Sequence, residues 1–266
     1  MALATSSLQR EPGRGGLSTL SVTVIAKNEE ASIARCLESV SFADEIILVD
    51  SGSTDRTIEI ARSLGAKVTQ TSDWPGFGAQ FNRAIDRATQ EWIFSLDADE
   101  WIEAPLAREI QKVIGDASSV TGYKMPRRSR FCGNVVRHSG WWPDYTPRLV
   151  RRGHGRFSEE IVHPHLIING TIGHLTNPIE HDSITSWEDA NDKIERYSTA
   201  AAIQLASRGR RAMPTTAPLR GAAAFLKAYL LRAGFLDGRT GLMVAEYNCR
   251  YTYQKWHKLA RMPKQR

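Results

Sequence analysis

The chain has 266 residues, of which 41% are hydrophobic and 24% are charged, as in soluble globular proteins that bury a full core. Its three cysteines, Cys36, Cys132 and Cys249, are odd in number and widely spaced. This spacing excludes a disulfide framework and a cysteine metal motif, and it favours a reducing compartment. No run of apolar residues is long enough to predict a membrane-spanning helix.

Basic residues are concentrated in the segment 207–266. This segment holds 13 Lys and Arg against two acidic residues, whereas the rest of the chain holds 22 basic and 27 acidic residues. Such a block indicates contact with an anionic surface, but no nucleic-acid-binding motif accompanies it, so we expect no nucleic acid partner. Residues 1–19 are polar and Gly-rich without an apolar core, which predicts a disordered tail and not a signal peptide.

Strands and helices alternate through the first half of the chain. Apolar, β-branched runs predict the strands, and apolar residues three or four positions apart predict the helices. In chain order, we expect strands at 20–25, 46–49, 66–69 and 91–96, separated by helices at 31–40, 56–64 and 80–89. This alternation predicts an α/β fold with a mostly parallel sheet and helices on both faces.

The pattern changes after Ile114. Residues 127–138 are basic and predict a loop, and short strands at 148–151 and 166–168 would form a mixed edge of the sheet. A helix at 187–205 precedes a basic linker at 208–218 that contains proline. This linker predicts a boundary between a domain at 20–206 and a basic helical region at 207–266.

The basic region contains an amphipathic pattern. In a helix over 219–236, one arc would carry Leu219, Ala222, Ala223, Phe225, Leu226, Tyr229 and Leu230. Arg220, Lys227 and Arg232 would flank this arc, as in a helix at a membrane interface. The segment 247–256 adds four aromatic residues among cations, as expected near lipid headgroups. The alternative is a helix packed on the rest of the chain, with a solvated basic face.

Acidic residues directly follow two of the predicted strands. Asp50 follows the strand at 46–49, and Asp97-Ala98-Asp99 follows the strand at 91–96. Ligands of parallel sheets bind at the carboxyl ends of the strands, where Asn28 also falls. Two carboxylates one residue apart can hold a divalent cation that also binds diphosphate oxygens.

The turn after the first strand, Lys27-Asn28-Glu29-Glu30, lacks the glycines of a phosphate-cradling loop. A diphosphate bound at this edge would therefore need a metal ion to neutralise it. Simpler interpretations remain open at this point: Asp97-Ala98-Asp99 as a surface turn, and Asp50 as part of a helix-capping turn with Ser51–Asp55.

Five blocks of the chain together resemble a known family. Ser21–Glu30, Val49–Asp55 and Leu96–Glu100 resemble, in order and spacing, the nucleotide-sugar half of family 2 glycosyltransferases, inverting enzymes with the Rossmann-like GT-A fold. His138–Asp144 and Leu231–Gly238 resemble the bacterial lipopolysaccharide core β-glucosyltransferases of that family. The resemblance extends from Leu20 to about Leu259.

The resemblance implies a site and a reaction. A hexose, expected to be glucose, would pass from a UDP-sugar to a sugar hydroxyl of a lipopolysaccharide core or similar lipid-linked glycan. The enzyme would be cytoplasmic and peripheral to the inner membrane, with an anionic membrane surface as a partner. Mg²⁺ or Mn²⁺ would bind Asp99 as the principal ligand, and Asp97 would face the ribose or the metal. His181 is a candidate further contact of the metal or the diphosphate, with a purely structural histidine as its alternative. The implied donor contacts are Ala26, Lys27, Asn28, Glu29, Asp50 (to the nucleobase), Gly52, Asn82, Asp97 and Ala98.

Inversion needs a carboxylate that takes the proton of the acceptor hydroxyl. The candidates are Asp144, Glu159 and Glu160, each of which has a solvated acidic edge as its alternative. Related sequences often carry a glutamate where this chain has Pro164, so that position is excluded as the base. His138 and Arg148 are candidates for contact with a phosphorylated acceptor or the donor diphosphate. Arg148 is suited to this because a guanidinium binds phosphate through two nitrogens.

Two other functions remain as alternatives. A sugar-nucleotide pyrophosphorylase would show the same alternation of strands and helices. We would expect a Gly- and Arg-rich loop after its first strand, and Lys27-Asn28-Glu29 does not supply one. A catalytically inactive, membrane-associated scaffold of the same fold is the second alternative, and Pro164 is the one hint towards it.

Overall fold

The structure is a computed structural model that describes residues 18–159 and 164–262. Most of the expected tail at 1–19 lies outside these residues, as does Glu160. The described chain divides into two compact units. The first holds residues 18–126, 145–159 and 164–180, and the second holds 127–144 and 181–262. Among the described residues, no helix combines the length and hydropathy needed to cross a membrane.

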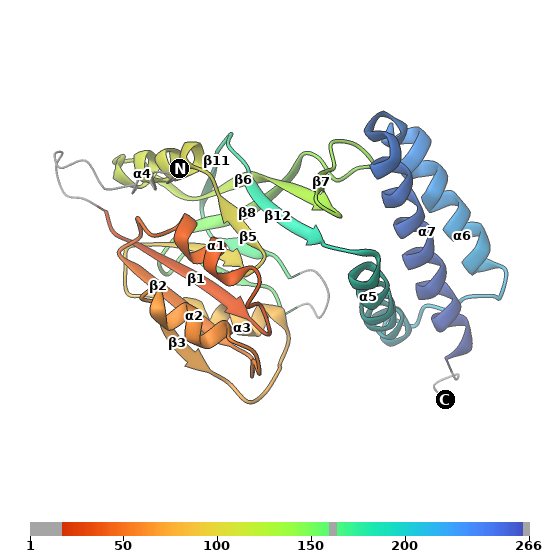
Figure 1. Ribbon diagram of the computed structural model, residues 1–266, viewed down its shortest axis with the longest axis horizontal. Coiled ribbons are helices and arrows are strands. Elements are labelled where there is room, and N and C mark those ends of the chain that lie inside the picture. Colours follow the sequence, from red (N-terminus) through yellow and green to blue (C-terminus); the bar gives the residue numbers. More distant parts are fainter. Residues whose placement is uncertain (1–17, 160–163, 263–266) are drawn as a thin grey trace, which may run out of the picture. The chain divides into compact units, whose positions relative to one another are not determined.

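Parallel strands form the centre of the first unit. They are β1 (Leu20–Ala26), β2 (Glu45–Asp50), β3 (Lys67–Gln70) and β4 (Trp92–Asp97), in the spatial order β3-β2-β1-β4. The register pairs Ala26 with Asp50 and Ile25 with Asp97. The carboxyl ends of β1, β2 and β4 therefore meet at one edge of the sheet (Figure 1). The predicted strands are confirmed here to within one residue.

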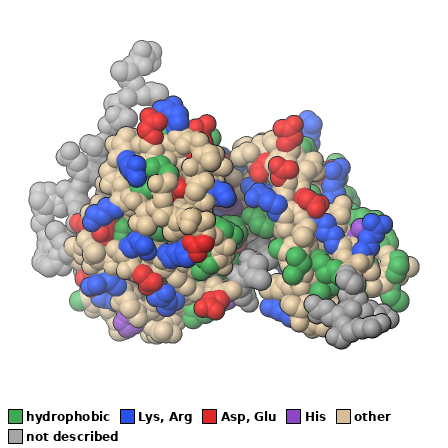
Figure 2. All heavy atoms as spheres, turned by 90° about the horizontal axis from the view of Figure 1, so that it is seen from below, with side chains coloured by type: hydrophobic (Ala, Val, Ile, Leu, Met, Phe, Trp, Pro, Cys, Tyr) green, Lys and Arg blue, Asp and Glu red, His purple; other side chains and the backbone are tan. Residues whose placement is uncertain are grey.

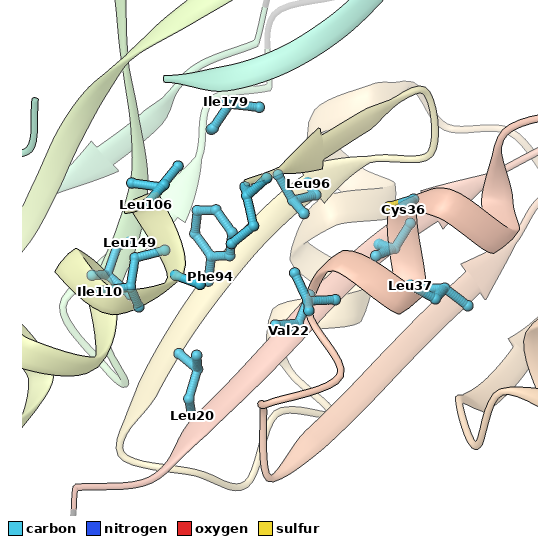
Figure 3. Close-up of a cluster of buried hydrophobic side chains, with 14 of the residues drawn as sticks. Leu20, Val22, Cys36, Leu37, Phe94, Leu96, Leu106, Ile110, Leu149 and Ile179 are labelled. Atoms are coloured by element: carbon cyan, nitrogen blue, oxygen red, sulfur yellow. The ribbon is translucent and has the colours of Figure 1, made fainter. Parts of the chain in front are cut away.

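Helices cover both faces of this sheet. Successive side chains of each strand point to opposite faces, and apolar side chains on both faces are buried against helices. One face packs against α1 (Ile33–Ser39), α2 (Thr57–Ser63) and α4 (Ala104–Gly115), and the other packs against α3 (Phe77–Ile85). Figure 3 shows the first of these cores, in which Leu96 and Phe94 of β4 lie with side chains from α1 and α4. The predicted α/β class is confirmed.

The sheet continues as a mixed edge, as predicted. The strand β8 (Asp144–Arg151) is antiparallel to β4, and the order continues β8-β6-β12-β5. Here β6 is Val120–Phe131, β12 is Ile179–Ile184 and β5 is Glu100–Ile102. The short strands β11 (Thr171–His174) and β7 (Asn134–Val135) also pair with β6. β6, β8 and β12 run on into the second unit.

Two expectations for this region were wrong in detail. Residues 127–131 form part of β6 and not a loop, because their basic side chains find acidic partners on neighbouring strands. Arg127 pairs with Asp144 at 2.6 Å, and Arg130 lies 3.9 Å from Asp182. The strand β10 (Leu166–Ile168) has the predicted range, but it pairs with β9 (Gly155–Phe157) outside the main sheet.

The second unit is built mainly from α5 (Trp187–Ser207), α6 (Thr216–Leu226) and α7 (Gly238–Arg261) (Figure 1). The helix α5 belongs to the same compact unit as the C-terminal helices α6 and α7. The boundary between the units therefore does not fall at the expected position, 206/207. Both α5 and α6 pack on α7. The linker is also shorter than expected, because Pro218 lies in the first turn of α6, where a missing N–H is tolerated.

The predicted helix over 219–236 is interrupted. After α6 the chain forms a π-helical turn (Lys227–Leu231) and then a 3₁₀ turn (Gly234–Asp237). Ala233 between them has φ of 53°, a left-handed conformation that ends the helix. The following Gly234 is packed so closely that a Cβ there would lie 2.4 Å from the Ser139 hydroxyl.

The aromatic residues at 247–256 were expected near lipid headgroups. Two of them, Tyr247 and Trp256, instead pack inside the helical unit, whereas Tyr253 is 39% exposed. Trp256 is 8% exposed and lies in a core with Ala202 and Leu259. The ring of Tyr247 lies 5.9 Å from that of Phe131, and burial raises the pKa of Tyr247 to about 12. These residues therefore hold the second unit together.

Candidate functional site

The loop after β2 is built on the carboxylate of Asp50, which is fully buried. Its Oδ1 accepts hydrogen bonds from the backbone N–H groups of Gly52 and Ser53, both at 2.9 Å, and its Oδ2 accepts one from the Ser53 hydroxyl. Gly52 has φ of 86°, which glycine adopts without strain. Asp50 thus shapes the loop, as the turn interpretation anticipated.

The loop after β1 is bound to the loop after β2. The N–H of Asn28 donates to the Ser53 hydroxyl at 2.8 Å, and its Oδ1 accepts from the N–H of Thr54 at 2.8 Å. The N–H of Glu29 donates to the Thr57 hydroxyl at 2.7 Å. The segment from Ala26 to Glu29 and the loop around Asp50 and Gly52 therefore form one continuous surface, so the structure brings these predicted donor residues together.

The turn after β4 is held by a buried arginine. Nη2 of Arg148 donates to Asp97 Oδ2 at 2.7 Å and to Glu100 Oε1 at 2.8 Å. The N–H of Asp97 donates to Glu100 Oε2 at 3.0 Å, which closes the turn around Ala98 and Asp99. The Glu100 side chain is 0% exposed and that of Arg148 is 6% exposed. Arg148, expected to bind phosphate, instead neutralises these two carboxylates.

The charges at this edge affect the groups beside it. Burial alone would lower the pKa of the Arg148 guanidinium, but the charges of Glu100 and Asp97 outweigh burial and raise it. The buried thiol of Cys36 lies 3.6 Å from the Asp97 carbonyl oxygen. Its burial, together with the negative charges of Glu100 and Asp99, raises the pKa of Cys36 well above its usual value. Cys36 is therefore a neutral packing residue.

The acidic turn fits a metal ion only together with a ligand. Asp99 is half-buried on the turn, and Oδ2 of Asp97 is engaged by Arg148. Within residues 18–159 and 164–262, no three His, Cys, Asp or Glu side chains are grouped so that they alone could hold a metal. Mg²⁺ is commonly bound by one or two carboxylates plus substrate phosphates. The donor set present here, led by Asp99, fits that kind of site.

His181, a predicted metal ligand, belongs to the second unit. It lies on β12, where its Nδ1 is 3.0 Å from the hydroxyl of Ser129 on β6. Asp144, a candidate base, also belongs to the second unit, and its Oδ2 accepts hydrogen bonds from two nitrogens of Arg127 at 2.6 and 3.1 Å.

Asn82, a predicted donor contact on α3, is hydrogen-bonded to the backbone of β9. Its Nδ2 donates to the carbonyl of Phe157 at 3.0 Å, and its Oδ1 accepts from the N–H of Phe157 at 2.9 Å. Asn82 therefore anchors β9 to α3. Glu159 lies just after β9 and is exposed, whereas Glu160 lies outside the described residues.

His138 does not stand alone in the second unit. Its Nδ1 lies 2.7 Å from Oδ1 of Asp237, whose Oδ2 accepts hydrogen bonds from the N–H groups of Arg137 and His138 at 3.0 and 2.8 Å. The blocks around His138 and Asp237 lie far apart in the sequence, but they are joined in the structure.

Sequence reasoning missed two supporting residues of the site. Glu100 directly follows Asp99, but only the pairing of β4 with β8 shows that it shares Arg148 with Asp97. Gln80 of α3 is fully buried and donates to the hydroxyls of Ser51 and Thr71, both at 2.8 Å. A polar residue on an otherwise apolar helix face was the available signal for Gln80.

Comparisons with known proteins bear on this site. Residues 21–169 match the family model described as glycosyl transferase family 2. The lipopolysaccharide core biosynthesis glycosyltransferase LpsC of Rhizobium meliloti (strain 1021) is 29% identical over 257 residues, which cover 92% of this chain and 95% of LpsC. An uncharacterized glycosyltransferase of Rickettsia bellii (strain RML369-C) is 30% identical over 84% of this chain and 80% of its own length.

Solved structures give more distant matches. Residues 1–349 of S. aureus TarS match with a TM-score of 0.48 and 18% identity over 90% of each chain. The glucosyl-3-phosphoglycerate synthase of Mycobacterium tuberculosis, solved with Mn²⁺, UDP and glucosyl-3-phosphoglycerate, matches with a TM-score of 0.37 and 23% identity. That match covers 46% of this chain and 51% of the synthase. The sheet with helices on both faces is the architecture expected of GT-A enzymes. Because the family model matches more than half of its residues, the chain belongs to glycosyl transferase family 2.

Proposed function

We propose that this protein is an inverting, metal-dependent hexosyltransferase that moves glucose from UDP-glucose to a sugar hydroxyl of a lipopolysaccharide core or similar lipid-linked glycan. The observation that supports this most is the single sheet edge shared by the joined loops after β1 and β2 and the acidic turn after β4. The similarity to LpsC supports the acceptor class.

The nucleoside would lie against the joined loops at Lys27, Asn28 and Gly52. Asp50 would act in one of two ways. Its Oδ2 would exchange the Ser53 hydroxyl for the nucleobase, or Asp50 would hold the loop that contacts the base. Gln80 stabilises this loop through its hydrogen bond to the hydroxyl of Ser51.

Asp99, with or without Asp97, would hold Mg²⁺ or Mn²⁺ at the acidic turn, and His181 is a candidate further ligand. The ion would supply Lewis-acid stabilisation of the departing diphosphate. The chain's own contribution is positional, because Arg148 neutralises Asp97 and Glu100 and so fixes the turn that carries Asp99. Preorganised charge of this kind needs no rearrangement during the reaction.

A carboxylate among Asp144, Glu159 and Glu160 would take the proton of the acceptor hydroxyl. Changing each to its amide separates the candidates, because general-base catalysis contributes about 10²–10⁴-fold to a rate. The variant that removes the base should lose transfer on that scale and keep UDP binding. The other two variants should stay within a few-fold of the native rate.

The protein would act at the cytoplasmic face of the inner membrane, as a peripheral protein that contacts anionic lipid. A lipid-linked acceptor and the 13 basic residues of segment 207–266 support this location. The net positive charge would attract the segment to anionic headgroups.

A screen of UDP- and GDP-sugars by thermal shift, with and without Mn²⁺, tests the donor, because selective binding raises the melting temperature. We expect a metal-dependent shift that is largest with UDP-glucose, followed by UDP release when a lipopolysaccharide core acceptor is added. Binding without UDP release from any acceptor would favour the inactive scaffold. Family membership argues against a pyrophosphorylase, which would release pyrophosphate from a nucleoside triphosphate.

A further inference from the structure

The helix α6 packs on α7 through its small residues and not through its large apolar ones. Ala217, Gly221 and Ala228 are the buried positions of α6 and the following π turn. The contact at Gly221 is close, since a Cβ there would lie 3.3 Å from Cβ of Tyr253. A helix of a soluble domain normally turns its large apolar residues towards the core. Here they face outwards.

Large apolar side chains are exposed along α6, through both turns and into α7. The exposed fractions are 70% for Leu219, 51% for Leu226, 53% for Leu230, 81% for Leu231, 48% for Phe235, 62% for Leu236 and 45% for Leu242. We call these seven residues the apolar ridge.

The two halves of the ridge are linked by aromatic contacts. The ring of Phe235 lies 6.4 Å from that of Tyr229, which lies 5.6 Å from that of Phe225. The 3₁₀ turn thus packs back on the end of α6 and the π turn. The ridge is therefore part of an ordered corner, and its exposure is not that of a loose chain end. Exposed apolar patches of this kind mark sites of interaction.

Four cations lie along the segment that carries the ridge, and one of them, Arg220, also stacks 4.1 Å from the centre of the Trp256 ring. Arg220, Lys227, Arg232 and Arg239 are all exposed, and Asp237 is the one acidic residue between 219 and 242. The carboxylate of Asp237 is occupied by His138 and by backbone N–H groups. Figure 2 shows the other end of the α5–α7 helices, at the right, where green, blue and red side chains are mixed; the turns at 227–237 face away from the viewer in that picture.

This combination of charge and exposed apolar surface selects among possible partners. A symmetric dimer through the ridge would bring like charges together, because a two-fold interface pairs the same patch on both copies. An anionic bilayer instead offers phosphates to the cations and an apolar interior to the leucines.

We propose that the apolar ridge inserts into the boundary between headgroups and acyl chains of an anionic bilayer, with Arg220, Lys227, Arg232 and Arg239 at the phosphates. The proposal names the surface that would make the membrane contact included in the proposed function. Its evidence is the exposure and charge of the ridge, which do not depend on the transfer reaction. Tyr247 and Trp256 take no part, because they pack inside the helical unit.

Sedimentation of the full-length protein with lipid vesicles tests the proposal. We expect binding to vesicles that contain phosphatidylglycerol and much weaker binding to pure phosphatidylcholine. Leu230→Gln combined with Leu231→Gln should reduce binding at least about tenfold, since two inserted apolar side chains are lost. Lys227→Gln should reduce it about fivefold, and high salt should abolish that difference.

Ile203→Gln on α5 and Ile167→Gln on β10 are matched controls, because these side chains are 52% and 49% exposed but lie outside the ridge. Both should bind vesicles within twofold of the native protein. Far-UV circular dichroism should show that all variants keep their helices, as expected for exposed positions.

Equal binding of the ridge variant and the native protein, or failure of the native protein to bind anionic vesicles, would overturn the proposal. So would a native dimer that the ridge variant converts to a monomer while vesicle binding stays unchanged. The transfer reaction is tested apart from this, because Asp99→Ala should keep full vesicle binding. The ridge variant, in turn, should keep its activity on a lipid-free acceptor.

Discussion

Replacing Arg148 by methionine should destabilise the first unit, because it leaves two carboxylates without their shared cation. The guanidinium lies 2.7 Å from Asp97 and 2.8 Å from Glu100, whose side chain is 0% exposed. Breaking a buried ion pair by removing one partner costs about 3–5 kcal/mol, since the remaining charge is uncompensated. We expect Arg148→Met to lower the free energy of unfolding by about that amount.

A matched pair separates the effect of burial from the effect of removing an arginine. Arg156 and Asp86 also lie 2.7 Å apart, but their side chains are 60% and 54% exposed. Arg156→Met should cost less than about 1 kcal/mol, as for other exposed ion pairs. Adding Glu100→Gln to Arg148→Met should restore part of the lost stability, because it removes the buried negative charge.

Urea unfolding followed by tryptophan fluorescence and far-UV circular dichroism gives these free energies. If Arg148→Met is too unstable to measure, the double variant with Glu100→Gln should still fold and should show the intermediate value. A cost for Arg148→Met no larger than that for Arg156→Met would refute the buried ion-pair account of the acidic turn.

Two further predictions concern stability. Burial opposes the ionisation of Glu45, but hydrogen bonds, led by that from Lys67, outweigh it and lower its pKa from 4.5 to about 2. This folded-state pKa lies below the unfolded value, so the stabilisation is complete above pH 4.5 and is lost as the pH falls towards 2. Glu45→Gln should remove about 3 kcal/mol of pH dependence in that window, measured by urea unfolding, and an unchanged pH profile would contradict this. Asp237→Ala should destabilise the second unit by about 1–3 kcal/mol in the same assay, because it removes the acceptor of the N–H groups of Arg137 and His138. An unchanged midpoint of urea unfolding would contradict this structural role of Asp237.

The parallel half of the fold could be predicted because β1, β2 and β4 are buried on both faces and appear in the sequence as continuous apolar runs. β6 could not be predicted over residues 127–131. Its arginines resemble those of a solvated loop, and the acids that pair with them, Asp144 and Asp182, come from strands far away in the sequence. The break at Ala233 was missed although Gly234 follows it directly, because alanine is a strong helix former and a single glycine is tolerated inside a helical pattern.

The candidate site also has a part that could be predicted from the sequence and a part that could not. The loops at Asn28 and Asp50 and the turn at Asp97–Asp99 are local motifs at strand ends, so the sequence shows both the residues and their common edge. The role of Arg148 depends on a strand pairing across 51 residues, and that of Asn82 depends on a contact across 75. Residue type therefore suggested phosphate binding for Arg148, and the family resemblance suggested donor binding for Asn82.

Calorimetric titration of UDP in the presence of Mn²⁺ tests the central claim most directly, with native protein, Asp99→Ala and the exposed control Asp116→Ala. We predict that UDP binds the native protein and the control with equal, Mn²⁺-dependent affinity. Asp99→Ala should bind at least about tenfold more weakly, since Asp99 would hold the metal ion that neutralises the diphosphate. Equal UDP affinity in Asp99→Ala, or affinity independent of Mn²⁺ in the native protein, would contradict the assignment of the acidic turn as the metal and diphosphate site.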